Sequence, residues 1–344
     1  MEKKRYLDVL RVVCAFAVVL LHSNEGIWMF SFESYWIEAT VATMIFLFAV
    51  PCFVMASGAL LIDYSDRYPT KTFIEKRIEK TVVPYIAWCL IGIAYLIYRK
   101  ALSFEQLSIK TVVRMIVNNE VLPIYWFFIS IFAIYLFTPI LTFISKDKKK
   151  RVFEYIIVSM YVMNVALPFF WKIAGFGAFQ IQTPITTLCL YYVTGYYIDK
   201  YPISPKIRNT IYLLSFASLL VLLFGTISDS YKAGVVVQTY MGYADLPCFL
   251  YSVGIFCAFK QLSEPRVHNE RLEGILFRVV DFFVNETLGI YLVHWYVLNE
   301  LKVRLGLIHS DFIYRIPVGI AVFFISWLIT KLLRKIPVVK RIVP

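Results

Sequence analysis

Long apolar runs recur along this chain of 344 residues, and short clusters of charged residues separate them. Each run holds about 17–25 mainly apolar residues, enough for a helix to cross the roughly 30 Å hydrocarbon core of a membrane. We find no short segments of alternating hydrophobicity, which are typical of a membrane β-barrel. A helix satisfies its backbone polar groups within one segment, as the membrane interior requires. The sequence therefore predicts an all-α integral membrane protein.

About ten transmembrane helices are predicted, in a single transmembrane domain over residues 1–344. The spans are 6–24, 41–62, 81–98, 123–144, 152–170, 184–199, 209–227, 241–260, 284–303 and 313–333. Lysine and arginine collect in cytoplasmic loops, so their distribution indicates the orientation. With the N-terminus inside, 25 of the 35 Lys and Arg residues lie on the cytoplasmic side and 9 lie outside. Both termini are therefore predicted inside, and the net charge of +12 needs no nucleic-acid partner.

Two basic segments lie between predicted spans. KDKKKR at 146–151 is predicted as a solvated cytoplasmic turn. The segment 63–80 holds Lys71, Arg77 and Lys80 with apolar residues between them, which predicts a short interfacial helix before the third span.

The six cysteines all fall in apolar stretches. None forms a CxxC pair, and none lies at ligand spacing from a histidine. We interpret them as buried hydrophobic residues, so the sequence predicts neither a zinc site nor a disulfide.

Ionisable residues are concentrated in the first span. An ionisable side chain inside a membrane is costly, so it needs a partner or a function. Arg11 and His22 are eleven residues apart, which places them on one helix face, roughly 16 Å apart along the axis. Asp8 precedes Arg11, and Glu25 lies one turn beyond His22.

Two interpretations of this face remain open. Arg11 snorkels to lipid phosphates while His22 caps a helix end in the outer interface, or both line a passage inside the bundle. In the second interpretation His22 is suited to act as a general base toward a hydroxyl, since the pKa of histidine lies near working pH.

Two further sites carry charged or polar residues at helical spacing. Arg77 and Lys80 are one turn apart just before the third span, which suits either lipid headgroups or the phosphates of a cytosolic ligand. Tyr291 and His294 share a face of the ninth span. They fit either a packed aromatic helix with a satisfied histidine or a functional site.

These residues carry a resemblance to a known family. Arg11 and His22, in the setting LDVLRVVCAFAVVLLH, resemble the opening motif of the acyltransferase-3 family of membrane acyltransferases. Four later segments resemble further family motifs in the same order: KRIEKTVVPY at 76–85, YWFFISIFAIYLFTPIL at 125–141, YYVTGYYI at 191–198 and ETLGIYLVHW at 286–295. The resemblance covers nearly the whole chain.

The chain departs from the family pattern at two positions. Lys80 stands where the family usually has a second arginine. The lysine keeps the positive charge, but it lacks the planar guanidinium that binds a phosphate through two hydrogen bonds. Ile124 and Tyr125 precede Trp126, where the family often has a histidine. The donor side is therefore matched more closely than the acceptor side.

The resemblance implies an O-acyltransferase of a bacterial inner membrane. It implies transfer of an acyl group, usually acetyl from acetyl-CoA, to a hydroxyl of a cell-surface or exported glycan. Acyl-CoA is then a co-substrate, with no tightly bound cofactor and no metal. His22 is predicted as the catalytic residue, and Arg11, Arg77 and Lys80 as donor-binding residues. Supporting roles are predicted for Asp8, Glu25, Trp126, Tyr291 and His294.

Two other functions remain open from the sequence. Membrane domains similar to this family occur in proteins linked to serine uptake, so a transporter of a small solute such as an amino acid is the main alternative. A glycan polymerase or flippase partner is the other, although such proteins tend to have a larger polar outer loop.

Overall fold

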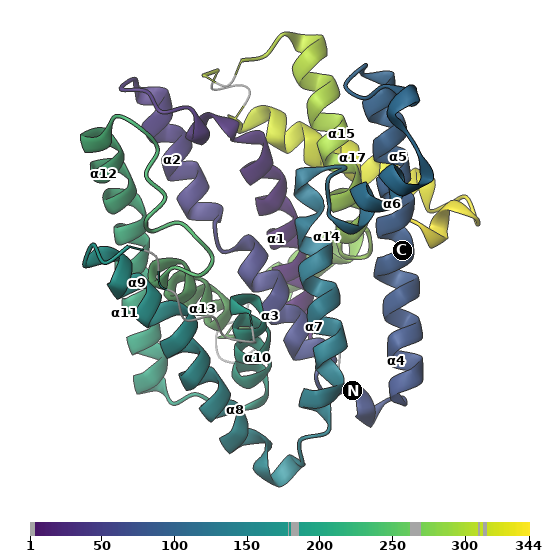
Figure 1. The fold of residues 1–344 in the computed structure, drawn as a ribbon. Helices are drawn as coiled ribbons and strands as arrows, with labels where there is room; N and C mark the ends of the chain where they lie inside the picture. The colour runs from purple at the N-terminus through teal and green to yellow at the C-terminus, as the bar shows by residue number, and fades with distance from the viewer. Residues whose placement is uncertain (1–3, 178, 180–185, 262–269, 309, 312–314) are drawn as a thin grey trace. The chain divides into compact units, whose positions relative to one another are not determined.

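A computed structural model of the chain describes residues 4–177, 179, 186–261, 270–308, 310–311 and 315–344. Every regular element in these ranges is helical, which confirms the all-α prediction. The chain forms two compact units (Figure 1). One comprises Met1–Ile62 with Ile144–Trp327, and the other comprises Asp63–Phe143 with Leu328–Pro344. The single transmembrane domain stays a prediction.

The first unit begins with α1 and contains most of the helices. Its elements are α1 (Arg5–Ser23), η1 (Glu25–Trp28), α2 (Ser34–Phe46), α3 (Ala49–Leu61), α8 (Lys146–Tyr161), η6 (Val162–Ala166), α9 (Leu167–Ile173), α10 (Thr187–Lys200), α11 (Pro205–Leu220), η7 (Val221–Gly225), α12 (Thr226–Ala233), α13 (Leu246–Gln261), α14 (Glu270–Phe283), η8 (Val284–Glu286) and α15 (Thr287–Leu305). The helix α17 (Pro317–Leu333) begins in this unit and ends in the second.

The second unit contains the basic segment and the helices that follow it. Its elements are η2 (Tyr64–Asp66), α4 (Thr70–Arg77), η3 (Ile78–Val82), α5 (Val83–Tyr98), η4 (Phe104–Gln106), α6 (Ile109–Val117), η5 (Pro123–Tyr125), α7 (Trp126–Thr142) and η9 (Val339–Arg341). The predicted helix in the segment 63–80 is present as α4. It continues through η3 into α5 without a break.

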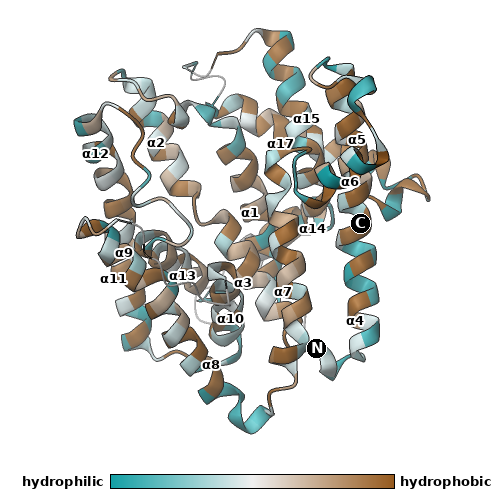
Figure 2. Cartoon of the chain, viewed as in Figure 1, coloured by the Kyte–Doolittle hydropathy of each residue, from teal (hydrophilic) through white to brown (hydrophobic). Residues whose placement is uncertain are grey.

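Six helical segments of the described residues are long and apolar enough to cross a membrane. They are Arg5–Ser23, Ser34–Asp66, Thr70–Tyr98, Pro123–Thr142, Lys146–Ile173 and Pro205–Ala233. The shorter helices α10 and α13, together with α15 and α17, overlap the other four predicted spans. Figure 2 shows apolar residues along most of the helices and hydrophilic residues at the start of α8 and in α4. The chain is a multi-pass membrane protein, while the count of ten spans and the orientation stay predictions.

Two of the long helical segments contain a π-helical stretch just before a proline. Proline has no N–H, and its ring clashes with the carbonyl four residues earlier. The stretch η3 ends two residues before Pro84, and η6 ends two residues before Pro168. Wider π turns accommodate both prolines without ending the helix.

The residues 146–151 are exposed as predicted, except Lys149, but the prediction that they form a turn was wrong. These residues form the first turns of α8, because lysine and arginine are good helix formers. Lys149 is only 3% exposed, and its Nζ atom lies 5.7 Å from the centre of the Tyr196 ring. The aliphatic stem of a lysine can be buried in this way while the charge meets an aromatic face.

The helix α1 lies at the centre of the first unit (Figure 1). It contacts α2, α3, α13, α14 and α15, and Leu10, Cys14 and Ala17 on it have no exposed surface. All six cysteines of the chain are buried, as predicted.

Glycines allow α3 and α10 to approach closely. A Cβ atom at Gly58 would lie 1.8 Å from the carbonyl oxygen of Tyr192. One at Gly195 would lie 2.2 Å from the carbonyl oxygen of Met55. Small residues bring membrane helices into backbone contact in this way, so this pair fixes the helix α3 against which α1 packs.

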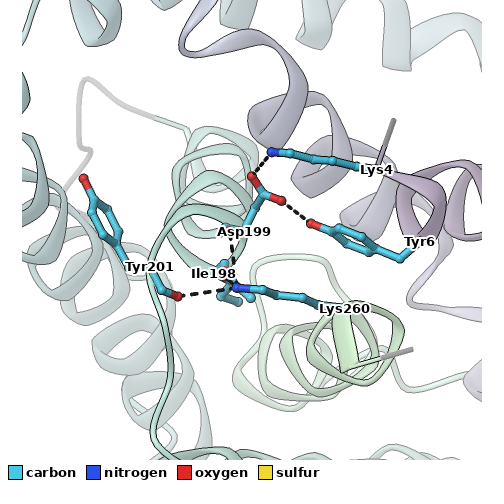
Figure 3. Close-up of polar contacts among 6 residues, drawn as sticks. All are labelled: Lys4, Tyr6, Ile198, Asp199, Tyr201 and Lys260. Atoms are coloured by element: carbon cyan, nitrogen blue, oxygen red, sulfur yellow. Dashed lines mark hydrogen bonds and ion pairs between the residues drawn. The ribbon is translucent and has the colours of Figure 1, made fainter. Parts of the chain in front are cut away.

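A polar cluster joins α1, α10 and α13 at the C-terminal end of α10 (Figure 3). The carboxylate of Asp199 accepts hydrogen bonds from Lys4 and from the Tyr6 hydroxyl, the latter at 2.5 Å. Nζ of Lys260 donates to backbone carbonyls at the same helix end, those of Ile198, Asp199 and Tyr201. A cation at a helix C-terminus satisfies carbonyls that have no partner within the helix. The cluster therefore fastens the N-terminal end of α1.

Candidate active site

Two histidines meet near the C-terminal end of α1. Nδ1 of His22 lies 2.7 Å from Nε2 of His294 on α15. The ring centroids are 4.9 Å apart, and the ring planes differ by 10°. When two ring nitrogens lie 2.7 Å apart, the centroids are farthest from each other if the rings meet end to end. The observed separation of 4.9 Å is close to that limit. The rings therefore meet edge to edge in nearly one plane, joined by a hydrogen bond.

The two rings differ in exposure. His294 is fully buried, with 0% of its surface exposed, whereas His22 is half-buried. Nδ1 of His294 lies 2.6 Å from the carbonyl oxygen of Tyr291 and 3.3 Å from that of Ile290. Nδ1 of His294 thus finds its hydrogen-bond partners within its own helix, as one interpretation of the sequence proposed. Its remaining ring nitrogen meets the residue predicted to be catalytic.

Arg11 and His22 lie on one face of α1, as their helical spacing predicts, and in the structure that face meets α15. Nη2 of Arg11 donates to the Thr287 hydroxyl over 3.4 Å, at the start of α15. His22 contacts His294 seven residues further along the same helix. The helices α1 and α15 therefore run side by side in the same direction.

The charge of Arg11 is paired on its own helix. Nη1 of Arg11 lies 3.7 Å from a carboxylate oxygen of Asp8, one turn earlier. Arg11 thus contacts both Asp8 on its own helix and Thr287 on α15. The donor-binding role predicted for Arg11 and the supporting role predicted for Asp8 stay predictions.

Ser23 anchors the end of α1 to the start of the last long helix. Its hydroxyl is fully buried and donates to the carbonyl oxygens of Arg315, at 2.8 Å, and Leu20, at 3.0 Å. The guanidinium of Arg315, which is also buried, pairs with Glu38 on α2. The residue that follows His22 is therefore bonded to the segment before α17, and Arg315 links that segment to α2.

Asn24 and Glu25 hold the same helix end from other sides. The amide of Asn24 donates to the carbonyl oxygen of Ala39 at 2.6 Å and to the Thr43 hydroxyl at 2.7 Å. Glu25 pairs with Lys302 on α15 at 2.5 Å. The four residues from His22 to Glu25 thus contact α2, α15 and the segment before α17, which limits how far the His22 ring can move.

The other predicted donor-binding residues belong to the second unit. The guanidinium carbon of Arg77 lies 5.6 Å from the ring centre of Phe73 and 5.4 Å from that of Tyr135. Nε of Arg77 is buried and has no hydrogen-bond partner among the described residues. Lys80 is exposed in η3, and Trp126 is half-buried at the start of α7. The structure brings none of these three into the histidine pair's own unit.

Sequence reasoning missed Thr287, Lys302 and Ser23. Thr287 lies two turns before His294, so helical periodicity places it on the same face. That signal was available in the sequence. The Glu25–Lys302 pair joins residues 277 positions apart and the Ser23–Arg315 bond joins residues 292 positions apart, and no local pattern identifies such contacts.

In the part of the chain that the structure describes, no group of three or more His, Cys, Asp or Glu side chains is placed to hold a metal ion. The groups available for chemistry are the half-buried His22, its fully buried partner His294 and Arg11 on the same face of α1. A neutral imidazole beside a substrate hydroxyl can take the proton of that hydroxyl.

Comparison with known proteins identifies the family. No curated protein and no solved structure matches the chain significantly. A family model described as an acyltransferase domain matches residues 4–331, nearly the whole chain, and gives no support to the transporter interpretation. The chain therefore belongs to the acyltransferase-3 family and is a membrane acyltransferase.

Proposed function

We propose that this protein is an O-acyltransferase that moves an acetyl group from cytoplasmic acetyl-CoA to a hydroxyl of a cell-surface or exported glycan. The observation that carries the proposal is the half-buried imidazole of His22, held at the end of α1 by a 2.7 Å hydrogen bond to His294. Acetyl-CoA acts as a co-substrate, with no tightly bound cofactor. The distribution of lysine and arginine supports cytoplasmic termini, and we place the protein in a bacterial inner membrane.

The chemistry assigned to His22 is general base catalysis. His22 accepts the proton of the acceptor hydroxyl while the hydroxyl oxygen attacks the thioester carbonyl carbon. The C–S bond then breaks, and the same proton passes from His22 to the departing CoA sulfur. Proton transfer by a positioned histidine typically contributes a factor of about 10²–10⁴ to the rate.

Binding of the acetyl-CoA donor is assigned to three basic residues. Arg77 and Lys80 are proposed to bind phosphate groups of CoA, and Arg11 to steady donor charge. The Arg77 guanidinium is supported by two aromatic rings, and its Nε lacks a partner among the described residues. An arginine held in one orientation suits phosphate, because its planar fork then loses little freedom on binding.

Binding of acetyl-CoA to the detergent-purified protein tests this assignment. We expect Arg77→Ala to weaken binding at least tenfold and His22→Ala to bind normally but to lose acetyl transfer. Lys71→Ala is the matched control, because Lys71 is an exposed cation on the same helix. Equal binding by wild type and Arg77→Ala contradicts the donor assignment. Absence of binding at near-millimolar acetyl-CoA contradicts the proposed donor altogether.

A further inference from the structure

The contacts of His294 determine where its protons lie. Among the described residues, the hydrogen-bond partners of His294 Nδ1 are carbonyl oxygens, those of Tyr291 at 2.6 Å and Ile290 at 3.3 Å. A carbonyl oxygen accepts hydrogen bonds and cannot donate them, so Nδ1 of His294 must carry a proton. In a neutral ring the other nitrogen, Nε2, is then an acceptor.

The proton positions of His22 follow from those of His294. Nδ1 of His22 lies 2.7 Å from the acceptor Nε2 of His294, so the hydrogen bond requires a proton on Nδ1 of His22. The lone pair of a neutral His22 is then on Nε2. A positively charged His294 would reverse this bond, but that would place an ion at a position with 0% exposure.

Ring geometry supports a directed hydrogen bond. The planes differ by only 10°, and the edge-to-edge arrangement aligns the N–H of His22 with the in-plane lone pair of His294. The two histidines also differ in exposure. His294 is sealed from any substrate, whereas His22 retains accessible surface.

We propose that His294 is a positioning residue that fixes the tautomer of His22, so that Nε2 is the nitrogen that takes the acceptor's proton. This inference rests on the proposed acyl transfer. When Nε2 of His22 accepts the proton, the O–C bond forms and the C–S bond breaks. The proton then leaves Nε2 for the CoA sulfur. His294 keeps its own proton throughout and remains neutral, and its Nε2 accepts a stronger hydrogen bond from the transient His22 imidazolium.

The arrangement performs the orienting task that an aspartate performs in a Ser-His-Asp triad, with a neutral acceptor in place of a carboxylate. A neutral partner suits a buried position in a membrane protein, where an unpaired carboxylate would be costly. The backbone carbonyls of Ile290 and Tyr291 complete the chain of acceptors.

The tautomer is directly measurable. The chain has four histidines, so a variant with His268→Asn and His309→Asn leaves only the pair to be observed. In the ¹⁵N-histidine-labelled protein, we expect His22 to show a protonated Nδ1 and a bare Nε2. In the same background, His294→Leu should give His22 a mixture of tautomers. A proton on Nε2 of neutral His22 in the parent protein would overturn the proposal.

Kinetics of two substitutions supply the second readout. His294→Leu removes the acceptor, and we expect kcat to fall about 100-fold with KM for acetyl-CoA within twofold. His294→Gln keeps an amide oxygen that can accept from Nδ1 of His22, and it should restore kcat to within about tenfold of wild type. An unchanged kcat in His294→Leu, or equal loss in both variants when both are folded, contradicts the proposal. If the parent shows the expected tautomer but transfers no acetyl group, the proposed function fails and the tautomer assignment stands.

Discussion

Replacing Gly195 by alanine should force α3 and α10 apart. The new Cβ atom would lie 2.2 Å from the Met55 carbonyl oxygen, whereas ordinary contact begins at 3.4 Å, a shortfall of 1.2 Å. The obstacle is backbone, which cannot rotate away as a flexible side chain can. Overpacking of this kind costs about 1–3 kcal/mol. Replacing a helical glycine by alanine returns roughly 0.5–1 kcal/mol, because alanine loses less conformational entropy on folding.

Gly274 provides the matched control. It lies within α14, and a Cβ atom there would have nothing within 4 Å. Gly274→Ala should therefore stabilise the protein slightly, and the two variants should differ by the overpacking cost of about 1–3 kcal/mol. Unfolding in SDS and detergent mixed micelles, followed by tryptophan fluorescence, measures this difference. If Gly195→Ala is as stable as Gly274→Ala, α3 and α10 are not packed through their backbones as described.

Three other substitutions test separate parts of the molecule. Ser23→Ala should lower the free energy of unfolding by about 1 kcal/mol in the same assay. The half-buried Ser159→Ala, which loses bonds only to its own helix, should cost less, and equal costs contradict the anchoring role. Asp199→Asn removes the charge that accepts from Lys4 and should cost about 1.5–3 kcal/mol, whereas an unchanged melting temperature contradicts the cluster's role. Arg77→Lys keeps the charge but loses the fork, so KM for acetyl-CoA should rise about tenfold with kcat within twofold, and a fall in kcat alone contradicts donor binding.

Helical periodicity accounts for what the sequence predicted about the candidate site. The eleven-residue spacing of Arg11 and His22 places them on one face, and both contact α15 in the structure. The same reasoning placed Tyr291 and His294 together. Local spacing along one helix is sufficient for such predictions, because the geometry of an α-helix is nearly constant.

Local sequence patterns do not predict contacts between segments that are far apart in the chain. His22 and His294 were each selected from the sequence, but their pairing depends on how α1 and α15 pack. Likewise, helix α2 begins at Ser34, earlier than the span predicted from residue 41. Glu38 lowers the hydropathy there, and its charge is compensated by Arg315 from the far end of the chain. The basic run at 146–151 was mistaken for a turn because its charges suggested solvent, while its helix propensity was decisive.

Acetyl transfer by the purified protein in proteoliposomes tests directly whether His22 carries out the chemistry. Labelled acetyl-CoA would be supplied with a glycan fraction from the bacterial envelope, and alkali-labile label on the glycan would be counted. We expect transfer by wild type and by the control His309→Ala. His22→Ala should reduce transfer at least 100-fold while still binding acetyl-CoA. Transfer by His22→Ala at the wild-type rate would show that His22 is not the catalytic residue.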